Sequence, residues 1–163
     1  MTTTQIGELA VRRSIEINAT AERVWEEFAS AERMRQWFTP AGGVDMGCKR
    51  LEYEPHVGGP WITEGIHEGE PFFFDGRVLV YDPPRELALE MGPFESGGVK
   101  GTSVVSFLLE PLSAGVTRIE LVHHGFESFG DAGRDTYEGF EGGWTTLQLE
   151  VIKRIVETGK ATA

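Results

Sequence analysis

The chain has 163 residues, of which 40% are hydrophobic and 25% charged, a balance typical of a globular protein with its own core. Its 26 acidic and 15 basic residues give a formal net charge of −11, which argues against binding to nucleic acid or to an anionic membrane surface. Its single cysteine, Cys48, excludes an internal disulfide and a cysteine-based metal site.

No apolar run approaches the roughly 20 residues of a membrane helix, and the first residues do not read as a secretory signal. We therefore expect one cytoplasmic domain over residues 1–163.

The N-terminal part predicts a strand followed by two short helices. Residues 11–18 alternate as a strand does, and Thr20 is placed to cap a first helix. A second helix is expected from Ser30, and it should end at residues 39–43 because proline and paired glycines cannot continue a helix. The buried stripes of these helices are Val24, Trp25 and Phe28, then Met34, Trp37 and Phe38.

From residue 51 to residue 123 the apolar pattern has a period of two and predicts six strands joined by tight turns. We expect a kink at residues 75–76 and a glycine-rich loop over residues 92–101. In the last strand, residues 117–123, alternation puts His123 on the inner side and leaves His124 pointing to solvent.

Apolar residues then recur at three- and four-residue steps from Tyr137 to Ile155, which predicts one long helix that Asp135 could cap. Gly139, Gly142 and Gly143 each cost about 1 kcal/mol relative to alanine in a helix interior. They suggest that the helix begins later or that something packs closely against it. An antiparallel meander must cover its apolar face, and this helix has the length to do so.

Six short stretches carry a resemblance to a known family through their order and spacing. They are residues 21–25 (AERVW), 34–38 (MRQWF), 58–61 (GGPW), 81–87 (YDPPREL), 123–126 (HHGF) and 143–145 (GWT). Together they resemble the SRPBCC (START, helix-grip) superfamily, and within it the domain called activator of heat-shock protein 90 ATPase homologue 1-like.

The resemblance implies an α+β helix-grip fold, also described as Bet v 1-like or START-like. Such a fold has a curved antiparallel sheet of six to seven strands around a long C-terminal helix, with two short helices after the first strand. Members of the superfamily bind lipids, steroids, polyketides and plant hormones, some cyclise polyketides, and the branch takes its name from co-chaperones.

No recognised catalytic signature occurs in the sequence, so the candidate site rests on side chains expected to face inward. His123 could bond a ligand or act as a general base, or it could be a structural histidine bonded within the fold. Trp37 and Phe38, just before the glycine loop, are expected at the cavity rim, while core packing is the alternative for most other aromatic residues. The candidate ligand-binding residues are Trp37, Phe38, Tyr53, Trp61, Arg77, Phe107, His123, Phe126, Phe140 and Trp144.

A metal site of Glu64, His67 and His123 is argued against by strand alternation, which puts Glu64 and His67 on opposite faces. We therefore assign no metal and no cofactor. Arg77 could pair with a ligand carboxylate or with an acidic neighbour. Cys48 is expected to be a small buried residue rather than a nucleophile.

Three functions remain open at this point. The first is binding of a small hydrophobic or aromatic ligand in a cavity between the sheet and the C-terminal helix. The second is a cyclase or hydrolase that uses His123, assisted by Tyr53 or Glu64. The third is a co-chaperone that activates a heat-shock protein 90 ATPase through an apolar patch on the outer face of the sheet. A homodimer and a chaperone partner are left open, and neither nucleic acid nor membrane is expected as a partner.

Overall fold

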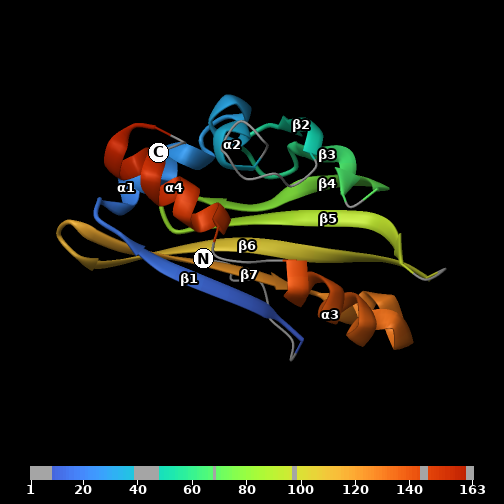
Figure 1. The fold of residues 1–163 in the computed structure, drawn as a ribbon. Helices are drawn as coiled ribbons and strands as arrows, with labels where there is room; N and C mark the ends of the chain where they lie inside the picture. Colours follow the sequence, from blue (N-terminus) through green and yellow to red (C-terminus); the bar gives the residue numbers. More distant parts are fainter. Residues whose placement is uncertain (1–8, 39–47, 68, 97–98, 144–146, 161–163) are drawn as a thin grey trace.

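The computed structural model describes residues 9–38, 48–67, 69–96, 99–143 and 147–160. A seven-stranded antiparallel sheet in the order β1-β7-β6-β5-β4-β3-β2 forms the body of the molecule (Figure 1). The strands are β1 (Val11–Ile17), β2 (Cys48–Tyr53), β3 (Pro60–His67), β4 (Glu70–Asp82), β5 (Glu86–Ser96), β6 (Val99–Ser113) and β7 (Val116–His124). Each strand from β2 to β6 pairs with the next one in the chain, and β1 pairs with β7, which confirms the predicted meander.

Two short helices follow β1, as the sequence predicts. They are α1 (Ala21–Trp25) and α2 (Ala31–Phe38), and a 3-10 turn, η1 (Glu26–Phe28), joins them. Thr20 Oγ1 accepts a hydrogen bond from the amide of Arg23 at 3.2 Å, and Ser30 Oγ accepts one from Arg33 at 3.1 Å. Each hydroxyl satisfies a backbone N–H that the first helical turn leaves unpaired.

The C-terminal helical region is described over residues 133–143 and 147–158, and the three residues between these parts lie outside the described part. It forms α3 (Gly133–Gly143) and α4 (Leu147–Thr158), so the glycines lie inside α3 and Asp135 lies in its first turn instead of capping it. Tyr137 of α3 packs on Phe126 of the preceding 3-10 segment, η3 (Phe126–Ala132), with ring centroids 5.7 Å apart. Such tertiary contacts offset the low helix propensity of glycine.

Helix α4 lies against β1, α1 and α2 (Figure 1). It buries Leu149, Val151, Ile152 and Ile155. At its C-terminal end Lys153 donates to the carbonyl of Glu16 at 3.0 Å, and Glu157 accepts from the amide of Asn18 at 2.8 Å. These contacts fix α4 to the C-terminal end of β1, which is an edge strand of the sheet.

Strand β4 is continuous where a kink was expected. Its first part pairs with β3 as far as Arg77, its last part pairs with β5, and the register shifts between Val78 and Val80. A Cβ atom at Gly76 would lie 1.7 Å from the carbonyl oxygen of Glu90, so this position requires glycine because β5 approaches so closely.

Most of residues 92–101 belong to strands, which corrects the expectation of a glycine-rich loop. Strand β5 runs to Ser96 and β6 begins at Val99, with a register irregularity between Met91 and Phe94. The ring of Phe129 lies against Gly101, where a Cβ atom would stand 2.7 Å from it. Glycine in this strand therefore marks a close approach by a neighbouring ring.

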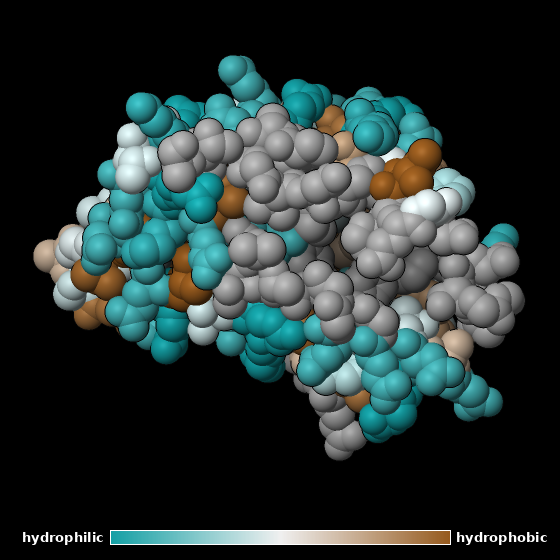
Figure 2. Space-filling view, viewed as in Figure 1, coloured by the Kyte–Doolittle hydropathy of each residue, from teal (hydrophilic) through white to brown (hydrophobic). Residues whose placement is uncertain are grey.

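The surface is mainly hydrophilic on the side shown in Figure 2, with scattered hydrophobic spots among the residues that the structure describes. This agrees with the formal net charge of −11. Among those residues no helix is both long and apolar enough to cross a membrane.

Candidate functional site

The inner face of the sheet, which carries the core residues, is the candidate site. Strand alternation places Trp61, Phe107 and His123 on this face, together with Leu87, Leu89, Val105 and Leu121. These side chains are buried, as the sequence predicts.

An aromatic cluster joins helix α2 to this face. Trp37 contacts Phe107 with ring centroids 5.4 Å apart, and Phe38 contacts Trp61 at 5.7 Å, both close to edge-to-face. The indole N–H of Trp37 donates to the carbonyl of Glu27 at 3.1 Å. Trp37 and Phe38 are thus buried, and both their place at a cavity rim and their contact with a ligand stay predictions.

Tyr53 and Arg77 lie on different faces of the sheet, and the contact of Tyr53 with a ligand stays a prediction. The Tyr53 hydroxyl donates to the carbonyl of Phe28 at 2.6 Å, and burial raises its pKa, so it holds β2 to the turn η1. Arg77 is exposed between the buried residues Gly76 and Val78. It therefore points away from the inner face, because successive side chains of a strand alternate, and the expectation that it faces the cavity is wrong.

His123 lies on the inner face and bonds a side chain that the sequence reasoning did not single out. Its Nε2 lies 2.7 Å from Ser103 Oγ, both residues are fully buried, and the ring of Phe126 lies 4.8 Å from the imidazole. Burial, with a smaller effect of His124, lowers the pKa of His123 to about 3. The imidazole is therefore neutral at pH 7, and it suits hydrogen bonding better than proton abstraction near neutral pH.

A second serine–histidine pair occupies the opposite face of the same two strands. His124 Nε2 lies 3.5 Å from Ser106 Oγ, and both side chains are buried. The expectation that His124 is solvated is wrong, and burial lowers its pKa. Because the two pairs share strands and residue types but differ in face, each serves as a control for the other.

Thr63 is a second polar residue of the inner face that the sequence reasoning missed. It is 1% exposed, and its Oγ1 has no hydrogen-bond partner in the described part of the chain. It stands opposite Leu51 on one side and Phe74 on the other, two residues beyond Trp61. The alternation of β3 could have placed it inside, since Trp61 and Thr63 share a face.

The strand register places Thr63 and Ser103 toward the same end of the inner face. Trp61 of β3 pairs with Gly76 of β4, and Gly76 lies against the carbonyl of Glu90 in β5. Met91, which follows Glu90 in β5, pairs with Ser103 of β6. Thr63 is one step further in the same direction, toward the end where β5 turns into β6. This is the end at which α3 lies in Figure 1, away from α1 and α4.

The remaining predictions concern the other candidate ligand-binding residues, the metal candidates and Cys48. Phe126 is buried as expected, whereas the side chain of Phe140, the residue Trp144 and the glycine loop at 42–43 lie outside the described part. Glu64 is exposed on the outer face, and the side chain of His67 is not described. Among the described residues no group of three or more His, Cys, Asp or Glu could hold a metal ion. Cys48 is buried, and burial raises its thiol pKa, as fits a packing residue.

The curled antiparallel sheet, its inner aromatic face and the C-terminal helix define a helix-grip domain. Residues 18–157 match the family model described as Activator of Hsp90 ATPase homolog 1-like protein, and the chain belongs to this family.

Solved bacterial structures share the fold over most of the chain. Protein MLL2253 from Mesorhizobium loti is 19% identical with a TM-score of 0.67, and CV1439 from Chromobacterium violaceum is 26% identical with a TM-score of 0.65. Each alignment covers 91% of this chain and 96% of the other. DynU16, described as a putative protein in the dynemicin biosynthetic locus, is 21% identical with a TM-score of 0.65, over 95% of this chain and 49% of that one. The comparison with curated proteins gives no match.

Proposed function

We propose that this protein binds a small hydrophobic or aromatic molecule between the inner face of the sheet and the C-terminal helical region. Membership of the family supports a ligand-binding or co-chaperone-like domain. The observation that favours ligand binding is the Thr63 hydroxyl, which is buried without a hydrogen-bond partner among the described residues.

A hydroxyl in that position has an energetic cost that a ligand would remove. Leaving a buried donor or acceptor unsatisfied costs about 1–3 kcal/mol, and native proteins do so rarely. The neighbours of Thr63 on the inner face are Leu51, Phe74 and Trp61, which are apolar or aromatic. An apolar wall with few polar groups is the usual lining of a small-molecule site.

Two measurements test the proposal. Native mass spectrometry of the purified protein should show a bound mass that is lost under denaturing conditions. Titration with N-phenyl-1-naphthylamine, an uncharged dye that fluoresces in apolar surroundings, should saturate at one equivalent. If no mass co-purifies and the dye fluorescence does not saturate, ligand binding is refuted.

The geometry gives the enzyme alternative little support. Tyr53 is bonded to the Phe28 carbonyl, and Glu64 is exposed on the outer face, so neither is placed to assist His123 as expected. A histidine with a pKa of about 3 is also protonated too weakly at pH 7 to serve as an acid.

A co-chaperone-like role is the second candidate, and one observation favours it. Ile66 and Phe73 are 53% and 46% exposed, and the pairing of Ile66 with Pro71 makes them diagonal neighbours on the outer face of β3 and β4. Exposed apolar pairs of this kind suit contact with another protein. Loss of heat-shock protein 90 ATPase stimulation in the double variant Ile66→Ser, Phe73→Ser would support this candidate, and absence of stimulation by the wild type would refute it.

A further inference from the structure

We infer that the ligand is an uncharged aromatic molecule with two oxygen functions, one bonded by Thr63 and the other by Ser103 of the Ser103–His123 pair. This inference rests on the proposed function and specifies the chemical class of its ligand. Thr63 and Ser103 come from different strands but lie toward the same end of the inner face.

Both hydroxyls have hydrogen-bonding capacity left for a ligand. A hydroxyl offers one donor and two acceptor positions. Thr63 Oγ1 uses none of them within the described residues, and Ser103 Oγ bonds His123 Nε2 at 2.7 Å. The Ser103 hydroxyl therefore keeps at least one hydrogen-bonding position that His123 does not use, and the bond to His123 fixes the orientation of this hydroxyl.

The charge distribution on the inner face argues for an uncharged ligand. In β2 to β7 the described side chains that share the face of Trp61 and His123 carry no charge at pH 7, since burial keeps His123 neutral. Outside β2 to β7, Arg13 of β1 pairs with Leu121 and so shares the inner face, and Arg35 belongs to α2. Arg13 donates to the carbonyls of Arg12 and Glu141, and Arg35 donates to the carbonyl of Leu51 at 2.7 Å. A ligand carboxylate beside Thr63 and Ser103 would be desolvated with no charged partner among the described inner-face side chains of β2 to β7, at a large cost.

The aromatic class follows from what surrounds the two hydroxyls. Trp61 and Phe74 are neighbours of Thr63, and the ring of Phe126 lies tilted against His123 with ring centroids 4.8 Å apart. Aromatic rings favour contact with other rings through offset or edge-to-face packing. A flat ring system with an oxygen at each end would meet all of these groups at once.

Displacement of N-phenyl-1-naphthylamine by matched naphthalenes at pH 7 tests the inference. We expect 2-naphthol to bind more tightly than naphthalene, and at least one of the 1,5-, 2,6- and 2,7-dihydroxynaphthalenes to bind more tightly still. Each hydroxyl should contribute about three- to tenfold, as a neutral hydrogen bond does. 2-Naphthoate should bind no better than naphthalene.

Variants then assign each increment to its residue. Thr63→Val and Ser103→Ala should each remove one hydroxyl increment, measured as the affinity of each naphthol relative to naphthalene in the same variant. The matched controls are Thr117→Val, a buried inner-face threonine that donates to the Ala19 carbonyl, and Ser106→Ala on the opposite face of β6. Both should keep the two increments. If Ser103→Ala fails to fold, Thr63→Val decides, because valine has the same shape as threonine.

The outcomes separate this inference from the proposed function. If the dye binds but hydroxyl groups add nothing, or 2-naphthoate binds best, the inference is wrong while ligand binding stands. The inference is also wrong, and ligand binding still stands, if the control variants lose the hydroxyl increments as much as Thr63→Val does. If the dye does not bind at all, both fail.

Discussion

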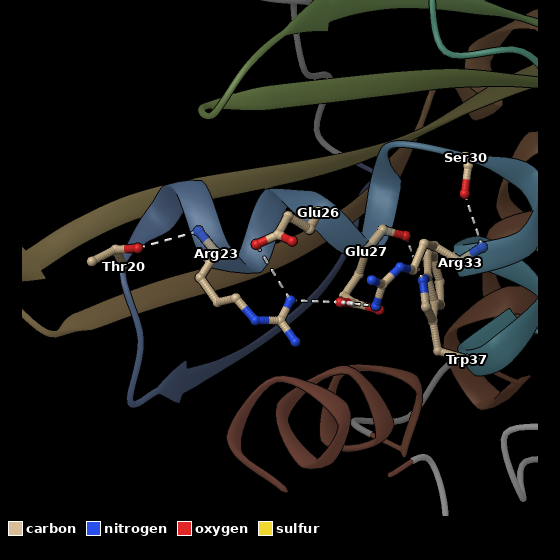
Figure 3. A network of polar contacts seen from close by, with 7 residues as sticks. All are labelled: Thr20, Arg23, Glu26, Glu27, Ser30, Arg33 and Trp37. Carbon is tan, nitrogen blue, oxygen red and sulfur yellow. Dashed lines mark hydrogen bonds and ion pairs between the residues drawn. The ribbon is translucent and has the colours of Figure 1, made fainter. Parts of the chain in front are cut away.

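Replacing Glu27 with glutamine should destabilise the protein, because this buried carboxylate links η1 to both flanking helices. Its Oε2 lies 2.8 Å from Arg23 Nη1 and 3.5 Å from Arg33 Nη1 (Figure 3). The side chain of Glu27 is fully buried, and its Oε1 has no hydrogen-bond partner among the described residues. The carbonyl of the same residue accepts the indole N–H of Trp37.

Two opposing effects set the magnitude. A hydrogen bond to a charged group contributes about 1.5–3 kcal/mol, but Arg23 and Arg33 are 32% and 43% exposed, so water will solvate them once the carboxylate is gone. Glutamine would also remove the buried negative charge, and its amide oxygen can still accept a hydrogen bond from each arginine. We therefore expect a net loss of about 1–2 kcal/mol, which for a chain of this length lowers the Tm by roughly 2–8 °C.

Urea unfolding at pH 7, followed by circular dichroism, measures this loss. The matched control is Glu110→Gln, whose carboxylate lies 2.9 Å from Arg118 Nη2 but is exposed, as is the arginine. The control should change stability by less than about 0.5 kcal/mol. A Glu27→Gln protein as stable as the control would refute the view that this carboxylate holds the two helices together.

Three further predictions concern other parts of the fold. His123 has a pKa of 6.5 when unfolded and about 3 when folded, so the unfolded state binds the proton first and stability should fall as pH drops from 6.5 toward 3. In urea titrations, the free energy of unfolding of His123→Gln should therefore fall by up to about 2 kcal/mol less than that of the wild type when the pH is lowered from 7.5 to 5. An equal fall in the two proteins would contradict the low pKa of His123. Gly76→Ala should cost about 3 kcal/mol because its Cβ meets the Glu90 carbonyl, whereas Gly115→Ala, with open space around it, should cost little in the same assay. Thr20→Ala should cost about 1 kcal/mol through loss of the α1 cap and Thr20→Ser far less, so equal unfolding midpoints for the two variants would count against the cap.

The fold was predictable where local patterns and tertiary packing agree. Period-two alternation placed His123 and Phe107 inside, and the hydroxyls of Thr20 and Ser30 marked two helix starts that the structure confirms. The connections between β2 and β3 and between β4 and β5 are short, as the sequence predicts for strands joined by tight turns.

What could not be predicted depends on contacts between distant segments. Gly101 looks like a loop residue until the ring of Phe129, 28 positions later, is seen to lie against it. The glycines of α3 look like helix breakers until Tyr137 packs on Phe126. His124 looks solvated from alternation alone, yet it is buried and its Nε2 lies 3.5 Å from Ser106 Oγ of the neighbouring strand.

The candidate site was predictable in its aromatic part and not in its polar part. Serine and threonine occur in most strands, so nothing in the sequence marks Ser103 as the partner of His123 or Thr63 as an unpartnered hydroxyl. Both facts depend on strand register and on exclusion from water, which a single sequence does not encode as a local pattern.

Strand β4 pairs with β3 along its first part and with β5 along its last part, and this pairing bears on the size of the ligand that we propose. Thr63 belongs to the section of β2, β3 and the start of β4, whereas Ser103 belongs to the section of β5, β6, β7 and β1. The crossover between them is at Gly76, where β5 presses against the backbone. A bulkier residue there would splay the two sections and widen the gap between the two hydroxyls. The separation of the two hydroxyls therefore depends on the backbone at Gly76, independently of the side chains that carry them.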